Sequence, residues 1–184
     1  MIPTVCRYLA AQQPVSKGID CRATLRNSSA MEIRPLQTSQ INAVARFYHA
    51  VWHETHAACQ DPRVVIPRTV PFFAARLQNW QETTIVAFTD ETPIGLVSWT
   101  KTHLEALFVG PQHRSCGLGA KLLGRAEAAM FKNHGQQLTL KCLCANRAGR
   151  RFYEGHGWRV KQQVDEVAGL EAWKFTPHWL MVKP

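Results

Sequence analysis

The stretch of residues 104–120, LEALFVGPQHRSCGLGA, constrains the fold more than any other part of the sequence. Its first part, 104–109, alternates Leu, Phe and Val with other residues, which predicts a strand, and the Gly110-Pro111 pair ends that strand. A basic turn that contains glycines then opens a helix. The first turn of a helix has N–H groups without carbonyl partners and carries a partial positive charge. The stretch therefore predicts a backbone cradle for a phosphate group.

Two glycines and one arginine determine the chemistry of this cradle. Gly117 and Gly119 permit close approach of a ligand and backbone angles that a side chain obstructs, and Arg114 can add a charge-assisted contact at the entrance. The common nucleotide motifs do not fit, because no Gly-Lys-Ser/Thr follows for a P-loop and Leu122 occupies the third glycine position of the dinucleotide fingerprint. A glycine-rich loop without a ligand is the alternative interpretation.

The pattern Arg114-x-x-Gly117-x-Gly119, after a strand and before a long helix, resembles the acyl-CoA-binding signature of the GCN5-related N-acetyltransferase (GNAT) family. Residues in that family's order and spacing follow downstream, and they are Asn146, Phe152-Tyr153-Glu154 and Gly157-Trp158. The resemblance is strongest over 104–158 and extends more weakly from about Met31 to the C-terminal strands.

Hydrophobic periodicity elsewhere predicts an α/β fold. Strands are expected at 31–35, 84–88, 94–99, 104–109, 138–144, 158–164 and 170–176. Helices are expected after a cap at Thr38 or Ser39 as far as Trp52, at 70–80, from the cradle to a cap at Gly135, and at 147–154. Because a helix separates strands 104–109 and 138–144, these two should run parallel. The resemblance implies a mixed, mostly antiparallel central sheet with flanking helices, in which this parallel pair splays apart around the pantetheine arm of CoA.

Length and composition favour one domain. The chain has 184 residues, 46% of them hydrophobic, which suffices for one core. We expect a single N-acetyltransferase domain over 31–184. Residues 1–30 lack sustained periodicity and are expected to be an N-terminal extension. It is either a flexible tail or a segment before a natural start at Met31, and an organelle-targeting peptide is weakly supported.

The charge of the chain favours anionic partners. Its formal net charge is +9, and the phosphates of CoA would satisfy it. Nucleic acid is disfavoured because the Lys and Arg residues are scattered and form no known nucleic-acid motif. No apolar run approaches 18 residues, so we expect no membrane partner. Nothing in the sequence determines the oligomeric state, and a homodimer stays open.

The cysteines and histidines indicate no metal site. Cys142 and Cys144 lie two apart on a predicted buried strand, which fits reduced thiols in a cytoplasm better than a disulfide framework. No Cys-x-x-Cys pair is present. The histidines in residues 52–56 are three apart, and Ala57 stands where a zinc-protease motif needs its second histidine.

The resemblance assigns the residues that bind acetyl-CoA, the co-substrate. They are Leu107, Phe108, Val109, Arg114, Ser115, Cys116, Gly117, Leu118, Gly119, Ala120, Asn146 and Tyr153. The main chain of the first three faces the pantetheine, and the segment 114–120 receives the pyrophosphate. Asn146 tethers the CoA arm, caps the short helix that follows, or does both.

Amine acylation also needs a base and an acid. An amine of pKa about 10 must lose a proton before it attacks a thioester, and His103 and Glu105, two apart on one strand face, are the candidate bases. The alternative is that Glu105 is a solvated strand residue and His103 a turn residue. Tyr153 matches the family's tyrosine that protonates the leaving thiolate, whereas a core aromatic is the alternative for it.

The function expected from these residues is acetyl transfer from acetyl-CoA to a primary amine of a small molecule, by direct attack in a ternary complex. Two other functions stay open: a protein or peptide N-acetyltransferase, and a non-catalytic acyl-CoA-binding regulatory module.

Overall fold

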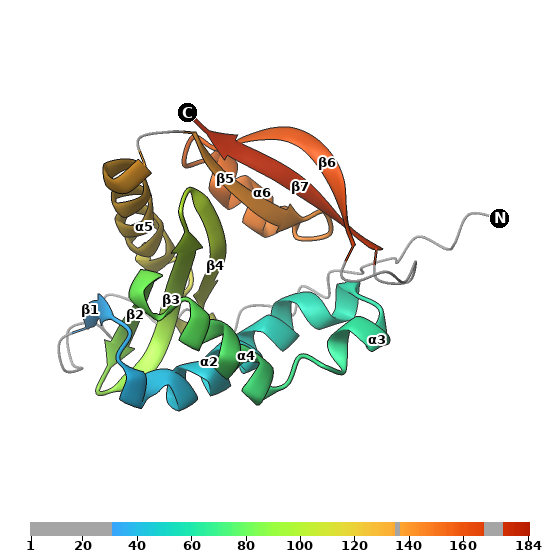
Figure 1. Ribbon diagram of the computed structural model, residues 1–184. Helices are drawn as coiled ribbons and strands as arrows, with labels where there is room; N and C mark the ends of the chain where they lie inside the picture. The colour runs from blue at the N-terminus through green and yellow to red at the C-terminus, as the bar shows by residue number, and fades with distance from the viewer. Residues whose placement is uncertain (1–30, 135–136, 168–174) are drawn as a thin grey trace.

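The computed structural model describes residues 31–134, 137–167 and 175–184 (Figure 1). The expected extension 1–30 and the expected helix cap Gly135 therefore lie outside the described residues.

The centre of the fold is a seven-stranded sheet with the order β1-β2-β3-β4-β5-β7-β6. Its strands are β1 (Glu32–Pro35), β2 (Thr84–Thr89), β3 (Thr92–Thr100), β4 (His103–Val109), β5 (Leu138–Leu143), β6 (Arg159–Val167) and β7 (Phe175–Lys183). Every neighbouring pair is antiparallel except β4 and β5, which are parallel. The predicted mixed, mostly antiparallel α/β sheet is confirmed.

Strands β4 and β5 pair only at their beginnings. Two residue pairs are in register, His103 with Thr139 and Leu104 with Leu140. Beyond Leu104 the two strands diverge, and Figure 1 shows the two halves of the sheet separating at this point. The backbone edge of β4 after Leu104 is therefore left without a neighbouring strand in the described part of the chain.

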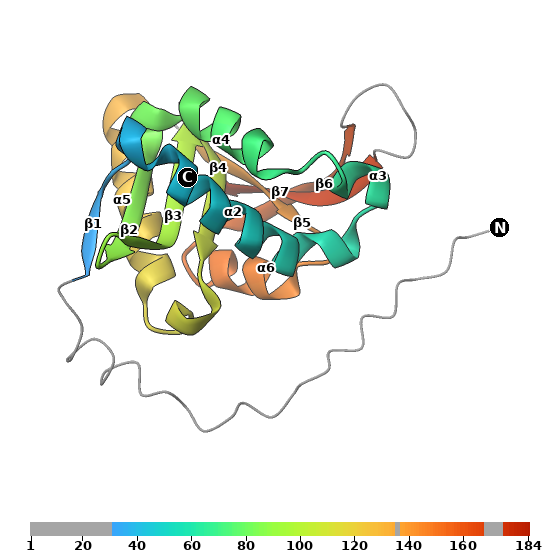
Figure 2. The ribbon, with the colours of Figure 1, turned by 90° about the horizontal axis from the view of Figure 1, so that it is seen from below.

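Helices cover both faces of the sheet. They are α2 (Ile41–His56), α3 (Pro62–Val65), α4 (Val70–Asn79), α5 (Leu118–His134) and α6 (Arg147–Glu154), and short 3-10 turns lie at 38–40, 57–59, 81–83 and 111–113. Side chains of β3 alternate between two cores: Val97 packs with Leu122 of α5, whereas Leu96 packs with Tyr48 of α2 and Phe73 of α4. Helices α2 and α4 thus share one face, where Figure 2 shows them side by side, and α5 lies on the other.

The N-terminal end of α2 differs from the prediction. Neither Thr38 nor Ser39 caps the helix, because both belong to a 3-10 turn that ends at Gln40, immediately before α2. The N–H of Gln37 donates to Oε1 of Gln40 across that turn at 3.3 Å. The polar residues at 38–40 therefore correctly predicted that a helix starts just after them. The prediction that Thr38 or Ser39 caps this helix was wrong.

The last strand also differs from the prediction. We expected 170–176, of which all but the final two residues lie outside the described residues, yet β7 is found at Phe175–Lys183, between β5 and β6. Pro177 lies inside β7 although it has no N–H to donate to the sheet, and its carbonyl accepts from the N–H of Cys144 at 3.0 Å.

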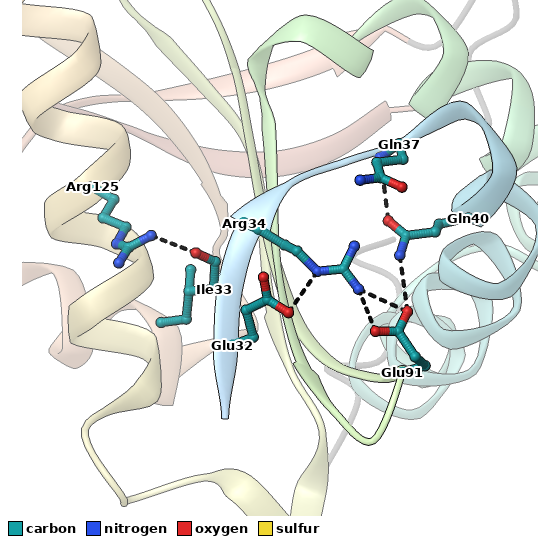
Figure 3. A network of polar contacts seen from close by, with 7 residues as sticks. All are labelled: Glu32, Ile33, Arg34, Gln37, Gln40, Glu91 and Arg125. Carbon is teal, nitrogen blue, oxygen red and sulfur yellow. Dashed lines mark hydrogen bonds and ion pairs between the residues drawn. The ribbon is translucent and has the colours of Figure 1, made fainter. Parts of the chain in front are cut away.

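Edge strand β1 is attached to its surroundings by a polar network (Figure 3). The guanidinium of Arg34 contacts Glu32 at 3.0 Å and donates to both carboxylate oxygens of Glu91 at 2.7 Å. Glu91 lies in the β2–β3 turn with φ of 59°, as the tight hairpin requires. On the other side of β1, Arg125 of α5 donates to the carbonyl of Ile33 at 2.7 Å. The network fixes β1 to both the hairpin and α5.

Candidate functional site

The cradle predicted at 114–120 forms the N-terminal end of α5. The first intrahelical bond runs from the N–H of Lys121 to the carbonyl of Gly117 at 3.1 Å. The N–H groups of Leu118, Gly119 and Ala120 precede that bond, so the helix supplies no carbonyl for them. Together with the helix dipole they form a binding site for an anion.

The two glycines of the cradle are required for different reasons. Gly117 has φ of +78°, a conformation that side chains rarely adopt, and an added Cβ would meet nothing within 4 Å. Gly119 instead lies against α6, where an added Cβ would stand 3.4 Å from two ring atoms of Phe152. Gly117 therefore shapes the turn beside open space, and Gly119 allows α6 to approach.

A second helix begins beside the first. Asn146 is the N-cap of α6, and its Oδ1 accepts from the N–H of Gly149 at 2.8 Å. A Cβ on Gly149 would stand only 2.6 Å from Nδ2 of Asn146, so this cap needs glycine there. The predicted capping role of Asn146 is confirmed, and its contact with CoA stays a prediction.

A cavity of about 500 Å³ opens between β4 and the beginnings of α5 and α6. We call it the larger cavity, to distinguish it from a smaller one on the α2 and α4 side. It is lined by Val51, Thr55, His56, Leu107, Phe108, Val109, Arg114, Ser115, Gly117, Gly119, Ala120, Asn146, Ala148, Gly149, Phe152, Tyr153 and His156. Every residue expected to bind acetyl-CoA lines it except Cys116 and Leu118, and the side chain of Leu118 is buried in the core beneath α5.

The exposed edge of β4 faces this gap with its backbone. The N–H of Gly110 donates to the carbonyl of Ile94 on β3 at 2.9 Å. Because successive amides of a strand point to opposite sides, the amides of Leu107 and Val109 point away from β3, toward the gap left by β5. The carbonyl of Val109 accepts there from Nε of Arg114 at 3.1 Å. The edge therefore offers backbone groups to an extended ligand.

Tyr153 is held at the wall of the larger cavity by other aromatic rings. Its ring meets Phe152 and Trp158 edge-on, with centroids 5.4 and 6.1 Å apart. Burial, with a smaller effect of the Cys142 thiol, raises the pKa of the Tyr153 phenol well above its usual 10. The hydroxyl therefore keeps its proton at neutral pH and can donate it.

Arg114 is engaged with the protein. Its guanidinium donates to both carboxylate oxygens of Glu54 on α2, at 2.9 and 3.2 Å. Both side chains are substantially exposed, at 39% and 44%, and such pairs contribute little to stability. Arg114 could therefore leave Glu54 for an incoming anion at small cost.

A smaller cavity of about 200 Å³ lies on the α2 and α4 side. It is lined by Tyr48, Trp52, His56, Gln60, Val64, Arg68, Phe72, Arg76, His103, Leu104, Glu105, Phe108, Lys141, Thr176 and His178. Both candidate bases are among them. Glu105 accepts from Oγ1 of Thr100 at 2.6 Å, and Nδ1 of His103 contacts Oγ1 of Thr139 at 2.8 Å. His103 is the first residue of β4 and not a turn residue.

His56 and Phe108 line both cavities. The imidazole of His56 stacks on the ring of Trp52, with the ring centroids 5.7 Å apart. Nδ1 of His56 lies 2.6 Å from Oγ1 of Thr55. Burial, and to a lesser extent the nearby His178, lowers the pKa of His56 to about 4, so the ring is neutral at pH 7. The helix was predicted to end at Trp52, whereas α2 continues to His56. The spacing of four between His56 and buried Trp52 is the signal that could have extended the predicted helix to it.

Two further classes of site find no support in the described parts of the chain. There, no three His, Cys, Asp or Glu side chains come together in a way that could hold a metal ion. No helix among those residues has the length and apolar character to cross a membrane.

The sequence and the fold both match known proteins. The model of the Acetyltransferase (GNAT) family matches residues 44–158. The uncharacterized N-acetyltransferase YhfO of Bacillus subtilis (strain 168) is 28% identical over 138 residues, which cover 70% of this chain and 89% of YhfO.

Solved structures share the fold at lower sequence identity. The PaiA N-acetyltransferase of Thermoplasma acidophilum, in complex with coenzyme A, superposes with a TM-score of 0.64 at 21% identity, over 84% of this chain and 99% of that chain. The putative acetyltransferase yncA of Salmonella typhimurium, with its cofactor acetyl-CoA, has a TM-score of 0.58 at 22% identity, over 84% of this chain and 93% of that chain.

Proposed function

Because this chain belongs to the GNAT family of acetyltransferases, we propose that it transfers an acetyl group from acetyl-CoA to a primary amine of a small molecule. The amine attacks the thioester directly while both substrates are bound. The observation that carries this proposal is that the larger and smaller cavities share His56 and Phe108 as lining residues.

The larger cavity suits acetyl-CoA, which supplies an activated acetyl thioester. The N–H groups at the start of α5, in the segment 114–120, can bind its pyrophosphate, as can Arg114 once it leaves Glu54. The amides of Leu107 and Val109 can pair with the amides of the pantetheine arm, which satisfies backbone groups that have no neighbouring strand.

Glu105 is our choice of general base. Its carboxylate lines the smaller cavity, where it can attract an ammonium group and take a proton from it before attack. Thr100 holds the carboxylate in place. His103 is the alternative base, and neutral His56, at the junction of the cavities, can orient the amine by a hydrogen bond.

Tyr153 is the general acid in this proposal. As the carbon–sulfur bond breaks, the departing sulfur becomes basic, with a thiol pKa of about 8.5. The Tyr153 hydroxyl, protonated and in the wall of the larger cavity, donates its proton to that sulfur. The nitrogen loses two protons on the way to the amide. Glu105 takes the first before attack and passes it to solvent, and the second leaves the tetrahedral intermediate and restores the proton that Tyr153 gives to the sulfur, so the reaction releases one proton overall.

The size of the smaller cavity favours a small acceptor over a protein chain. Its volume of about 200 Å³ lies below the roughly 300–1,000 Å³ of cavities that hold drug-sized ligands. A peptide acceptor needs more room than this around the residue that it inserts.

A panel experiment tests the proposal. Acetyl-CoA binding is measured by calorimetry, and free thiol release is measured with small amines and with peptides of varied N-terminus. We expect saturable binding and thiol release with small amines. Release with peptides alone would assign the acceptor to proteins. Binding without release from any acceptor would favour a regulatory module, and absent binding would refute the assignment of the larger cavity.

A further inference from the structure

The described residues that line the smaller cavity include more cationic than anionic side chains. They are Arg68, Arg76 and Lys141, beside one carboxylate among those residues, Glu105. A cavity lined by one sign of charge concentrates ligands of the opposite sign. An acceptor that carried only its ammonium group would have to enter against these cations.

Two of the cations are fixed in place by aromatic rings. The guanidinium of Arg68 lies over the ring of Phe72 at 4.3 Å, and that of Arg76 lies over Trp80 at 4.3 Å. Arg76 also approaches the ring of Phe72 at 5.7 Å. Stacked guanidinium groups lose little freedom when they bind an oxyanion, and their planar donor pairs match a carboxylate.

The pairing of Arg76 with Glu105 is incomplete. Nη2 of Arg76 lies 3.9 Å from Oε2 of Glu105, which is longer than a hydrogen bond. Nε of Arg76 is buried and has no hydrogen-bond partner in the described ranges. A buried donor without a partner is costly, so Arg76 retains capacity for an acceptor that a ligand can supply.

The charges also converge in space. Burial raises the pKa of Tyr48, which lines the same cavity, to about 12, and the charges of Arg76, Glu105 and Arg68 all act on this hydroxyl as smaller effects. One buried group thus senses both arginines and the carboxylate. The cavity therefore presents a negative group and two positive groups close to one another.

We propose that the acceptor is a small zwitterionic amine, in which the ammonium faces Glu105 and an adjacent oxyanion binds Arg76 and Arg68. The inference rests on the function proposed above and specifies its substrate class. Since Arg76 and Glu105 are neighbours, the two charges of the substrate must also be neighbours, as they are in an α-amino acid or an aminomethylphosphonate.

Matched acceptors test this inference. Thiol release is measured with alanine, alaninamide and ethylamine, and with 1-aminoethylphosphonate as the phosphonate counterpart of alanine. Alanine should exceed alaninamide in kcat/KM by roughly 10- to 100-fold, the value of hydrogen bonds to a charged group. The ratio of kcat/KM for alanine to kcat/KM for 1-aminoethylphosphonate shows which oxyanion fits better, the carboxylate or the phosphonate. Equal or faster reaction of alaninamide and ethylamine, which lack the oxyanion, overturns the inference and leaves acetyl transfer standing.

A variant separates charge recognition from a general defect. Arg76→Gln should reduce kcat/KM for alanine roughly tenfold or more beyond any effect on alaninamide, so the ratio of the two kcat/KM values falls. Arg46→Gln, at an exposed position of α2 outside the cavity, is the matched control and should keep the wild-type ratio. An unchanged ratio in Arg76→Gln contradicts the assigned contact.

A binding measurement makes the result independent of turnover. Calorimetry on the CoA-saturated protein compares N-acetylalanine with N-acetylalaninamide, the two products. Tighter binding of N-acetylalanine than of N-acetylalaninamide supports the inference, provided that Arg76→Gln weakens the binding of N-acetylalanine. Equal binding of the two products overturns it. If neither acetyl-CoA nor CoA binds, the proposed function fails, and the substrate class fails with it.

Discussion

Tyr153→Phe removes one hydroxyl from the wall of the larger cavity and keeps the ring that packs on Phe152 and Trp158. General acid catalysis contributes typically 10²- to 10⁴-fold to a rate. It is most effective when the pKa of the acid lies near the working pH, whereas burial raises the pKa of Tyr153 well above it. We therefore expect the low end, a loss of roughly 100-fold in kcat, or about 2.7 kcal/mol.

Three measurements on Tyr153→Phe distinguish this role from a structural one. Thiol release at saturating substrates gives kcat, calorimetry gives the dissociation constant of acetyl-CoA, and thermal unfolding gives Tm. The dissociation constant should change less than about threefold, because no contact with the cradle is lost. Tm should stay within about 4 °C, equivalent to about 1 kcal/mol for a chain of this size.

The reasoning about Tyr153 is refuted if kcat is unaffected. It is also refuted if kcat falls only in proportion to a loss of acetyl-CoA binding or of folded protein, since the tyrosine would then be a packing residue. In either case the proton for the departing sulfur must come from another group or from water.

Three further predictions concern stability, binding and pH. Glu127→Ala should lower the free energy of unfolding by about 1–3 kcal/mol. The buried indole N–H of Trp158 donates to Glu127 at 2.7 Å and would lose its acceptor. An unchanged Tm in thermal unfolding contradicts this. Glu54→Gln should release Arg114 and tighten acetyl-CoA binding up to about fivefold at low salt by calorimetry, and weaker binding would show that the ion pair supports the cradle. The unfolded chain protonates His56 below pH 6.5 and the folded chain only near pH 4, so acidification across this window should lower stability by up to about 1 kcal/mol per pH unit; His56→Gln should reduce that slope, and an identical slope would contradict the assigned pKa.

The cradle and the helix that follows it could be predicted because both depend on local sequence. The Gly110-Pro111 break, the positive φ of Gly117 and the cap at Asn146 each act within a few residues. The family resemblance over 104–158 is likewise confirmed, and it supplied the splaying of β4 from β5, which no local pattern encodes.

The parts that were missed depend on distant residues. Strand β7 takes its place by pairing with β5 and β6, and the carbonyl of Pro177 accepts from the N–H of Cys144, 33 positions away along the chain. His56 matters because α2 brings it against Phe108 of β4, and nothing near it in the sequence shows that contact. The smaller cavity combines side chains of α2, α4, β4, β5 and β7, so the charges that line it could not be added up before the fold was known.

The most direct test of the account is an NMR titration of the ¹⁵N-labelled chain with acetyl-CoA, followed by amide exchange in the complex. We predict saturable shifts and slowed exchange at the amides of Leu107, Val109, Gly119 and Ala120, with little change at the outer residues of β6. Binding that leaves these four amides unaffected, or shifts that cluster elsewhere, would contradict the assignment of acetyl-CoA to the gap between β4 and the starts of α5 and α6.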